Sequence, residues 1–136
     1  MNKNLLSLLL ILFFFNVNAQ IVNPKIIELP EKVSENDFSF LKEELKNVQV
    51  VMLGEKTHFD GNVFEVKTEI IKYLHQELGF NTIAFESGIY DVWKAQNSIN
   101  NGGATNVALN KSLFSIWSKK KSFAVLLTFL TQIKLH

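Results

Sequence analysis

Two short apolar runs flank a longer segment in which apolar residues recur at helical spacing. The first run, 48–53, is rich in β-branched residues and ends at Gly54, and its length and composition favour a buried strand over a helix. In 62–78 the apolar residues lie three or four positions apart, which predicts an amphipathic helix that stops at Gly79. The second run, 81–86, predicts another strand. The pattern therefore predicts a β-α-β unit.

The predicted fold class is α/β, with a parallel β-α-β core and flanking helices. Strands joined through a helix in this way lie parallel, and the crossover is right-handed in nearly all cases. A short helix is predicted after Ser34, and further helices are predicted over 89–99, 107–117 and 122–135. Because parallel sheets normally contain several strands covered on both faces, two strands make an incomplete core.

The first residues of the chain are typical of a signal peptide. Lys3 precedes an apolar stretch over 5–15, and Ala19 is a small residue that suits cleavage before Gln20. The stretch is shorter than the roughly 20 residues of a spanning helix, so no stable membrane anchor is expected after cleavage; an uncleaved anchor is the alternative. We therefore expect an exported protein, periplasmic or extracellular. The chain then divides into a signal peptide, a linker and one domain, over 1–19, 20–33 and 34–136.

The composition argues against nucleic acid as a partner. The 136 residues include 14 basic and 13 acidic ones, and every basic residue is a lysine. Arginine, whose planar fork suits phosphates and guanine edges, is absent, and the lysines are scattered except at 119–121. Cysteine is also absent, which excludes a disulfide framework, so the apolar core alone must hold the domain together.

Two glutamates and a histidine follow the predicted strands. Glu55 and His58 come directly after the first strand, in L-G-E-K-T-H, and Glu86 ends the second. Because parallel strands end at the same edge of a sheet, we expect these three side chains to converge there. A histidine beside a carboxylate can take a proton from water, while the carboxylate fixes its tautomer and stabilises the imidazolium. The constellation fits water-activated hydrolysis.

Spacing alone leaves three interpretations of these residues open. The first is a set of structural caps and loop hydrogen bonds, and the second is a metal-free proton relay. The third is a metal site, because Glu55, His58 and Glu86 would supply three ligands and leave an open position on zinc.

Three other polar residues nearby are assigned lesser roles by their surroundings. Lys67 lies about two turns into a helix that runs away from the predicted edge, so geometry favours a solvated or partly snorkelling lysine that does not reach the site. His75, further along the same helix, is expected to form surface or helix-end hydrogen bonds. Ser87 lacks the G-x-S-x-G elbow that would activate it as a nucleophile, because position 85 is a phenylalanine.

The residues from about 50 to 93 resemble the erythromycin esterase family. The resemblance rests on three stretches in order: V-V-M-L-G-E-K-T-H, F-E-V-K-T-E-I-I-K-Y-L-H-Q-E-L-G-F and I-A-F-E-S-G-I-Y-D-V-W. It implies a carboxylic ester hydrolase that opens macrolide lactone rings by attack of activated water, and hence a role in the antibiotic response. It also implies that His58 is the general base, that Glu55 and Glu86 are active-site carboxylates, and that Lys67 occupies a basic position of the family.

Family members are considerably longer and contribute a further active-site histidine from their C-terminal half. We therefore expect 34–136 to be a truncated N-terminal part of an erythromycin esterase-like hydrolase domain, incomplete relative to the family domain. The expected substrate is a small-molecule ester or lactone, and no cofactor is expected apart from the open question of a metal. The alternative hypotheses are a non-catalytic exported binding or interaction module and a metal-dependent hydrolase.

Overall fold

The computed structural model describes residues 24–55 and 61–133. The predicted signal peptide, 1–19, and His58 lie outside the described residues. Among the helices that are described, none is both long enough and apolar enough to cross a bilayer. The elements are the 3-10 helix η1 (Glu35–Phe38) and the α-helices α2 (Leu41–Glu44), α3 (Gly61–Gln76), α4 (Ile89–Asn100), α5 (Thr105–Ser112), α6 (Ser115–Ser118) and α7 (Lys121–Gln132).

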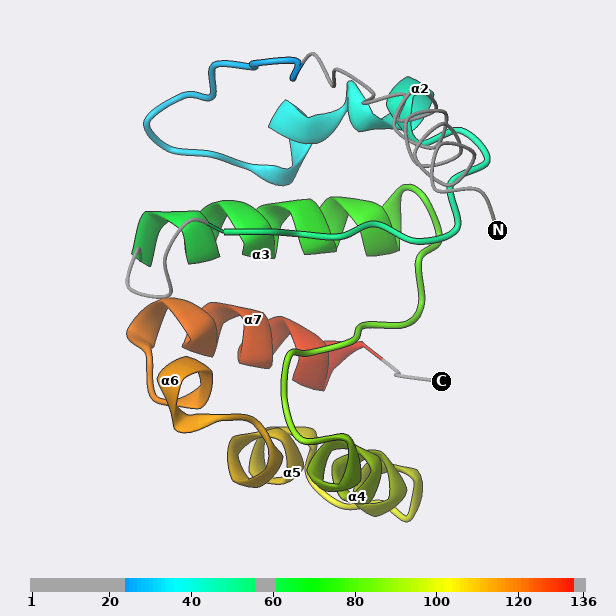
Figure 1. Cartoon of the computed structure of the whole chain (residues 1–136), viewed down its shortest axis with the longest axis vertical. Coiled ribbons are helices and arrows are strands. Elements are labelled where there is room, and N and C mark those ends of the chain that lie inside the picture. The colour runs from blue at the N-terminus through cyan, green and yellow to red at the C-terminus, as the bar shows by residue number, and fades with distance from the viewer. Residues whose placement is uncertain (1–23, 56–60, 134–136) are drawn as a thin grey trace, which may run out of the picture.

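The helices stack in layers, as Figure 1 shows. α3 packs between η1 and α7, and α5 covers the far side of α7. α4 packs against α5 at the far end of the stack, and α6 connects α5 to α7. Each layer therefore buries the apolar stripe of an amphipathic helix against its neighbour.

The core lies where α3, α5 and α7 meet. α7 contributes five of its buried residues because apolar side chains recur along it at helical spacing. Aromatic rings from α3, α6 and α7 fill the centre, and their ring planes are tilted or edge-on to one another. The buried core residues are Phe64, Ala95, Ala108, Leu109, Leu113, Trp117, Phe123, Leu126, Leu127, Phe129 and Leu130.

The predicted helices are confirmed, with differences at their ends. The central helix ends as predicted, because Gly79 has a φ of 74° and the Phe80 N–H donates to the Leu74 carbonyl oxygen over 3.0 Å. A residue in the left-handed region commonly closes a helix, and glycine adopts this conformation without steric cost. The predicted helix over 107–117 is instead divided between α5 and α6, because Leu113 adopts an extended backbone between them.

The predicted α/β class with a parallel β-α-β core is wrong, because the described residues contain helices and no strand. The two predicted strands are unpaired connections, 48–55 before α3 and 80–86 after it (Figure 1). The expected burial of the first connection is also wrong, because burial instead alternates along 50–55. Leu53 is partly buried, whereas Val50 and Met52 are exposed.

The two connections do not form a ladder with each other. Within 24–55 and 61–133 no backbone hydrogen bond joins them, and both line the same cavity instead. A ladder requires strands about 4.8 Å apart, and a sheet of two strands is marginal in water. The β-branched composition thus matched a half-buried extended chain, while strand formation depends on the neighbours that it meets.

Replacing Gly79 by alanine is expected to lower the free energy of unfolding by about 1–2 kcal/mol, because a Cβ is strained at positive φ. No atom would contact the new Cβ, so the effect isolates the backbone strain. Gly54→Ala is the matched control, since its Cβ would also meet open space and no positive φ is involved. Urea denaturation of both variants measures the difference. Equal stability of the two variants would contradict this account of the helix end.

Candidate active-site cavity

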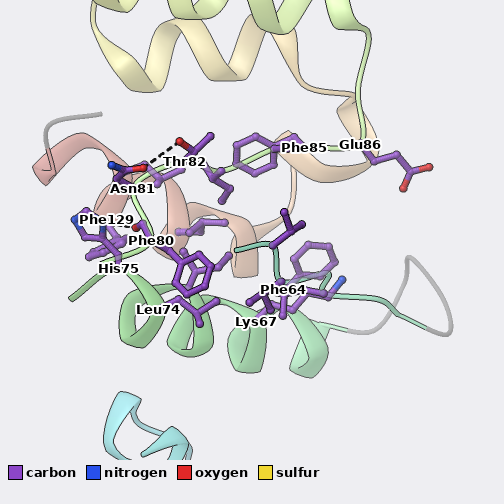
Figure 2. Close-up of a pocket in the computed structure, with 18 of the residues that line it drawn as sticks. Phe64, Lys67, Leu74, His75, Phe80, Asn81, Thr82, Phe85, Glu86 and Phe129 are labelled. Carbon is purple, nitrogen blue, oxygen red and sulfur yellow. Dashed lines mark hydrogen bonds between the residues drawn. The ribbon is translucent and has the colours of Figure 1, made fainter. Parts of the chain in front are cut away.

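A cavity of about 600 Å³ lies between α3, α7 and the two extended connections (Figure 2). Small-molecule sites commonly have volumes of roughly 300–1,000 Å³, with mostly apolar walls and a few polar groups. The walls of this cavity are likewise mostly apolar, with a few polar and charged side chains among them. Its walls from α3 and α7 are formed by Phe64, Lys67, Ile71, Leu74, His75, Leu126, Phe129 and Leu130.

An ion pair lies in the wall of this cavity. The Lys67 Nζ donates to Glu55 Oε2 over 2.6 Å, and the two side chains are only 17% and 9% exposed. Removing charges from water opposes such a pair unless its geometry is good, and the short contact satisfies that condition. The structure therefore brings together two of the four residues that the sequence singled out.

Lys67 was expected to be solvated or partly snorkelling and too far along the helix to reach the site, yet it contacts Glu55 and its side chain is 17% exposed. Lys67 would be distant from Glu55 if the first connection ended beyond the start of the helix, at the edge of a sheet. In the structure, 48–55 instead runs alongside α3, as Figure 1 shows. Glu55 consequently meets the helix about two turns from its start, where Lys67 lies.

Phe64 links the ion pair to the core. The centre of its ring lies 5.5 Å from the Lys67 Nζ and 4.9 Å from the Lys120 Nζ. Cations near an aromatic face are attracted by the quadrupole of the ring. The same ring packs 5.2 Å from Trp117, which also lines the cavity. The ammonium of Lys67 is therefore held by a carboxylate on one side and by an aromatic wall on another.

His75 lines the opposite end of the cavity from Lys67, as Figure 2 shows. Its Nδ1 lies 2.9 Å from the carbonyl oxygen of Phe80, and its ring packs edge-on to Phe129 at 5.9 Å. This contact confirms the predicted helix-end hydrogen bond. The position of His75 in the cavity wall was missed, although the helical spacing of Lys67 and His75 with the apolar residues between them indicated a shared face.

Glu86 lies at the mouth of the cavity and is exposed. Figure 2 shows its carboxylate turned away from the cavity and from Lys67. The predicted convergence relied on two strands ending at one sheet edge, and that sheet is absent from the described residues. His58, the third residue expected to converge there, is outside the described ranges. Of the three residues, the structure therefore places Glu55 and Glu86 only.

The hydroxyl of Ser87 has a structural role. It donates to the carbonyl oxygen of Ser112 over 3.0 Å and accepts from the Phe114 N–H over 3.2 Å. These bonds hold the connection that follows Glu86 against the junction of α5 and α6. The prediction that Ser87 is not a nucleophile agrees with this engagement.

Within the described ranges, no group of three or more histidine, cysteine, aspartate or glutamate residues is placed to hold a metal ion. The predicted zinc alternative needed His58 beside the two glutamates, and His58 is not among the residues searched. The aromatic residues Tyr90 and Trp93 are exposed on α4, and their rings stack on each other at 5.9 Å.

Comparison with known proteins gives two informative similarities. The chain is 38% identical over 84 residues to a Bacillus subtilis (strain 168) protein named "Putative hydrolase YbfO", covering 62% of this chain and 19% of that protein. It is 32% identical over 68 residues to erythromycin esterase type II of Escherichia coli, covering 50% of this chain and 16% of that protein. No protein-family model and no solved structure matches the chain.

Both related proteins carry names of hydrolases, and the matched segments make up less than a fifth of either one. The match therefore does not show that this chain has the activity of either related protein. The resemblance to the erythromycin esterases is confirmed as a partial homology. The segment related to erythromycin esterase type II makes up 50% of this chain.

Proposed function

We propose that this chain provides a hydrolase site that cleaves an ester or lactone bond with activated water. The observation that carries the proposal is the nearly buried pair of Glu55 and Lys67 in the wall of a cavity of small-molecule size. A polar pair within apolar walls is typical of sites that orient a substrate and tune a proton acceptor. The names of the two relatives support the same class of reaction.

In the proposed reaction His58 acts as the general base. It takes a proton from water while the water oxygen attacks the carbonyl carbon of the ester. The imidazolium then returns the proton to the departing alkoxide, so that the products are a carboxylic acid and an alcohol. Glu55 stabilises the imidazolium, and Lys67 fixes the Glu55 carboxylate by the 2.6 Å hydrogen bond.

The proposed substrate is an ester or lactone of small-molecule size. Erythromycin appears in the name of one relative, which makes a macrolide lactone one candidate substrate for this chain. A contribution to macrolide resistance depends on that candidate. The apolar walls of the cavity fit a substrate with a large apolar body.

The direct test is hydrolysis of an aryl ester by the purified chain, followed as release of the phenol. We expect saturable hydrolysis above the rate in buffer, and we expect it to persist in the presence of a strong chelator. Loss of activity with the chelator would favour the metal-dependent hydrolase instead. A rate equal to that in buffer for aryl esters and for a macrolide lactone would contradict the proposal and favour a non-catalytic binding module.

A further inference from the structure

The cavity has polar groups at both of its ends and an apolar wall between them. On α3, Lys67 and His75 are eight residues apart, which corresponds to about 12 Å along the helix axis. Both line the cavity, and the apolar Ile71 and Leu74 lie between them on the same wall. Figure 2 shows Lys67 and Phe64 at one end, and His75 with Asn81 at the other. A ligand that satisfies both ends must therefore be elongated.

The hydrogen bond of His75 determines what its ring offers to a ligand. A backbone carbonyl oxygen only accepts, so the Nδ1 that lies 2.9 Å from the Phe80 oxygen carries the proton. In the neutral ring, Nε2 is then an acceptor. No hydrogen bond engages Nε2 among the residues that the structure describes.

Asn81 adds a donor to the same end of the cavity. Its Oδ1 accepts from the Thr82 hydroxyl over 3.2 Å, which leaves the carboxamide nitrogen to donate. Asn81 and Thr82 both line the cavity. His75 is half-buried and Asn81 is exposed, and both line this end of the cavity. An acceptor and a donor at one end match a hydroxyl group, because a hydroxyl donates one hydrogen bond and accepts others.

We propose that His75 is a specificity-determining residue whose Nε2 accepts a hydrogen bond from a hydroxyl group at the far end of an elongated, otherwise apolar ester. This inference rests on the proposed function for the ester end of the ligand, at Lys67 and Glu55. It adds a second recognition point about 12 Å away along α3. The substrate class is thus an ester whose long apolar chain carries a terminal hydroxyl.

Binding without hydrolysis tests this inference separately from the proposed function. The probes are ω-hydroxydecanamide and decanamide, two amides that resist hydrolysis and differ only in the terminal hydroxyl. Trp117 lines the cavity and reports occupancy by its fluorescence, while Trp93→Phe removes the other tryptophan of the chain. In this background we expect the hydroxyl-bearing amide to bind about 2- to 10-fold more tightly, which is the contribution of one net hydrogen bond.

Two variants of His75 assign the preference to its ring. His75→Phe keeps a ring against Phe129 but has no acceptor, so we expect the two amides to bind with equal affinity. His75→Gln retains an acceptor oxygen and is expected to keep part of the preference, which a purely structural role of His75 would not produce. Circular dichroism checks that both variants keep the helical content of the parent chain.

Each outcome bears on the inference in a defined way. A hydroxyl preference in the parent that disappears in His75→Phe supports it, even if the chain hydrolyses no ester. Equal affinities of the two amides for the parent overturn it, whatever the variants do. Absence of any fluorescence change with either amide also overturns it, because the cavity then takes no such ligand. Ester hydrolysis without a hydroxyl preference leaves the proposed function standing and removes this inference alone.

Discussion

Glu55→Gln is expected to reduce kcat/KM for ester hydrolysis by about 10²- to 10⁴-fold, the usual contribution of a general-base system. Glutamine has the shape of glutamate but no charge, so the cavity remains while the anion beside Lys67 disappears. In the proposed reaction His58 becomes an imidazolium. The uncompensated ammonium of Lys67 would oppose this protonation, so the rate is expected to fall.

The matched control for this variant is Glu65→Gln, which removes an exposed carboxylate from α3. We expect it to retain the parent rate within a factor of about two, because surface charges are screened by solvent. Initial rates with an aryl ester measure both variants under the same conditions. A Glu55→Gln enzyme as active as the control would show that the pair with Lys67 is structural only.

Phe123→Ala is expected to lower the free energy of unfolding by about 3–5 kcal/mol, the usual cost of removing a buried phenylalanine ring. Phe123 is 2% exposed and packs against Phe64 at 6.3 Å and against Phe85 at 5.9 Å. It therefore joins α7 both to α3 and to the second connection. Small domains are stable by only about 5–15 kcal/mol, so this one change removes a large part of the total.

Val125→Ala on the same helix is the control, because Val125 is exposed. Its effect should stay within about 0.5 kcal/mol. Urea denaturation followed by circular dichroism gives both values. A loss below about 1 kcal/mol for Phe123→Ala would mean that the layered helical core described above does not determine the stability of the chain.

The sequence predicted the helices well because their signal is local. The apolar stripe of 122–135 and the stop at Gly79 depend only on spacing and on the conformational freedom of glycine, and α7 and the end of α3 confirm both. A strand, in contrast, exists only through a partner, and composition carries no information about whether that partner is present.

Only part of the candidate site was predicted, because local spacing identifies single residues but not their contacts with distant parts of the chain. Glu55 was identified from its place after an apolar run, yet its contact with Lys67 required the path of 48–55 along α3, which no pattern in the sequence specifies. His75 was assigned a helix-end hydrogen bond correctly. Its spacing from Lys67 indicated a shared helix face, but the packing of α3 against α7 was needed to show that this face lines a cavity. Long-range packing therefore supplied what local spacing could not.

The measurement that tests the central claim most directly is kcat/KM for ester hydrolysis by Glu55→Gln, by His58→Ala and by the double variant. Groups that act as a unit give strongly non-additive losses, because removing either one disables the same step. We predict that the double variant is no slower than the slower of the two single variants. Losses that multiply in the double variant, or a His58→Ala enzyme with the parent rate, would contradict the claim that Glu55 and His58 together activate water.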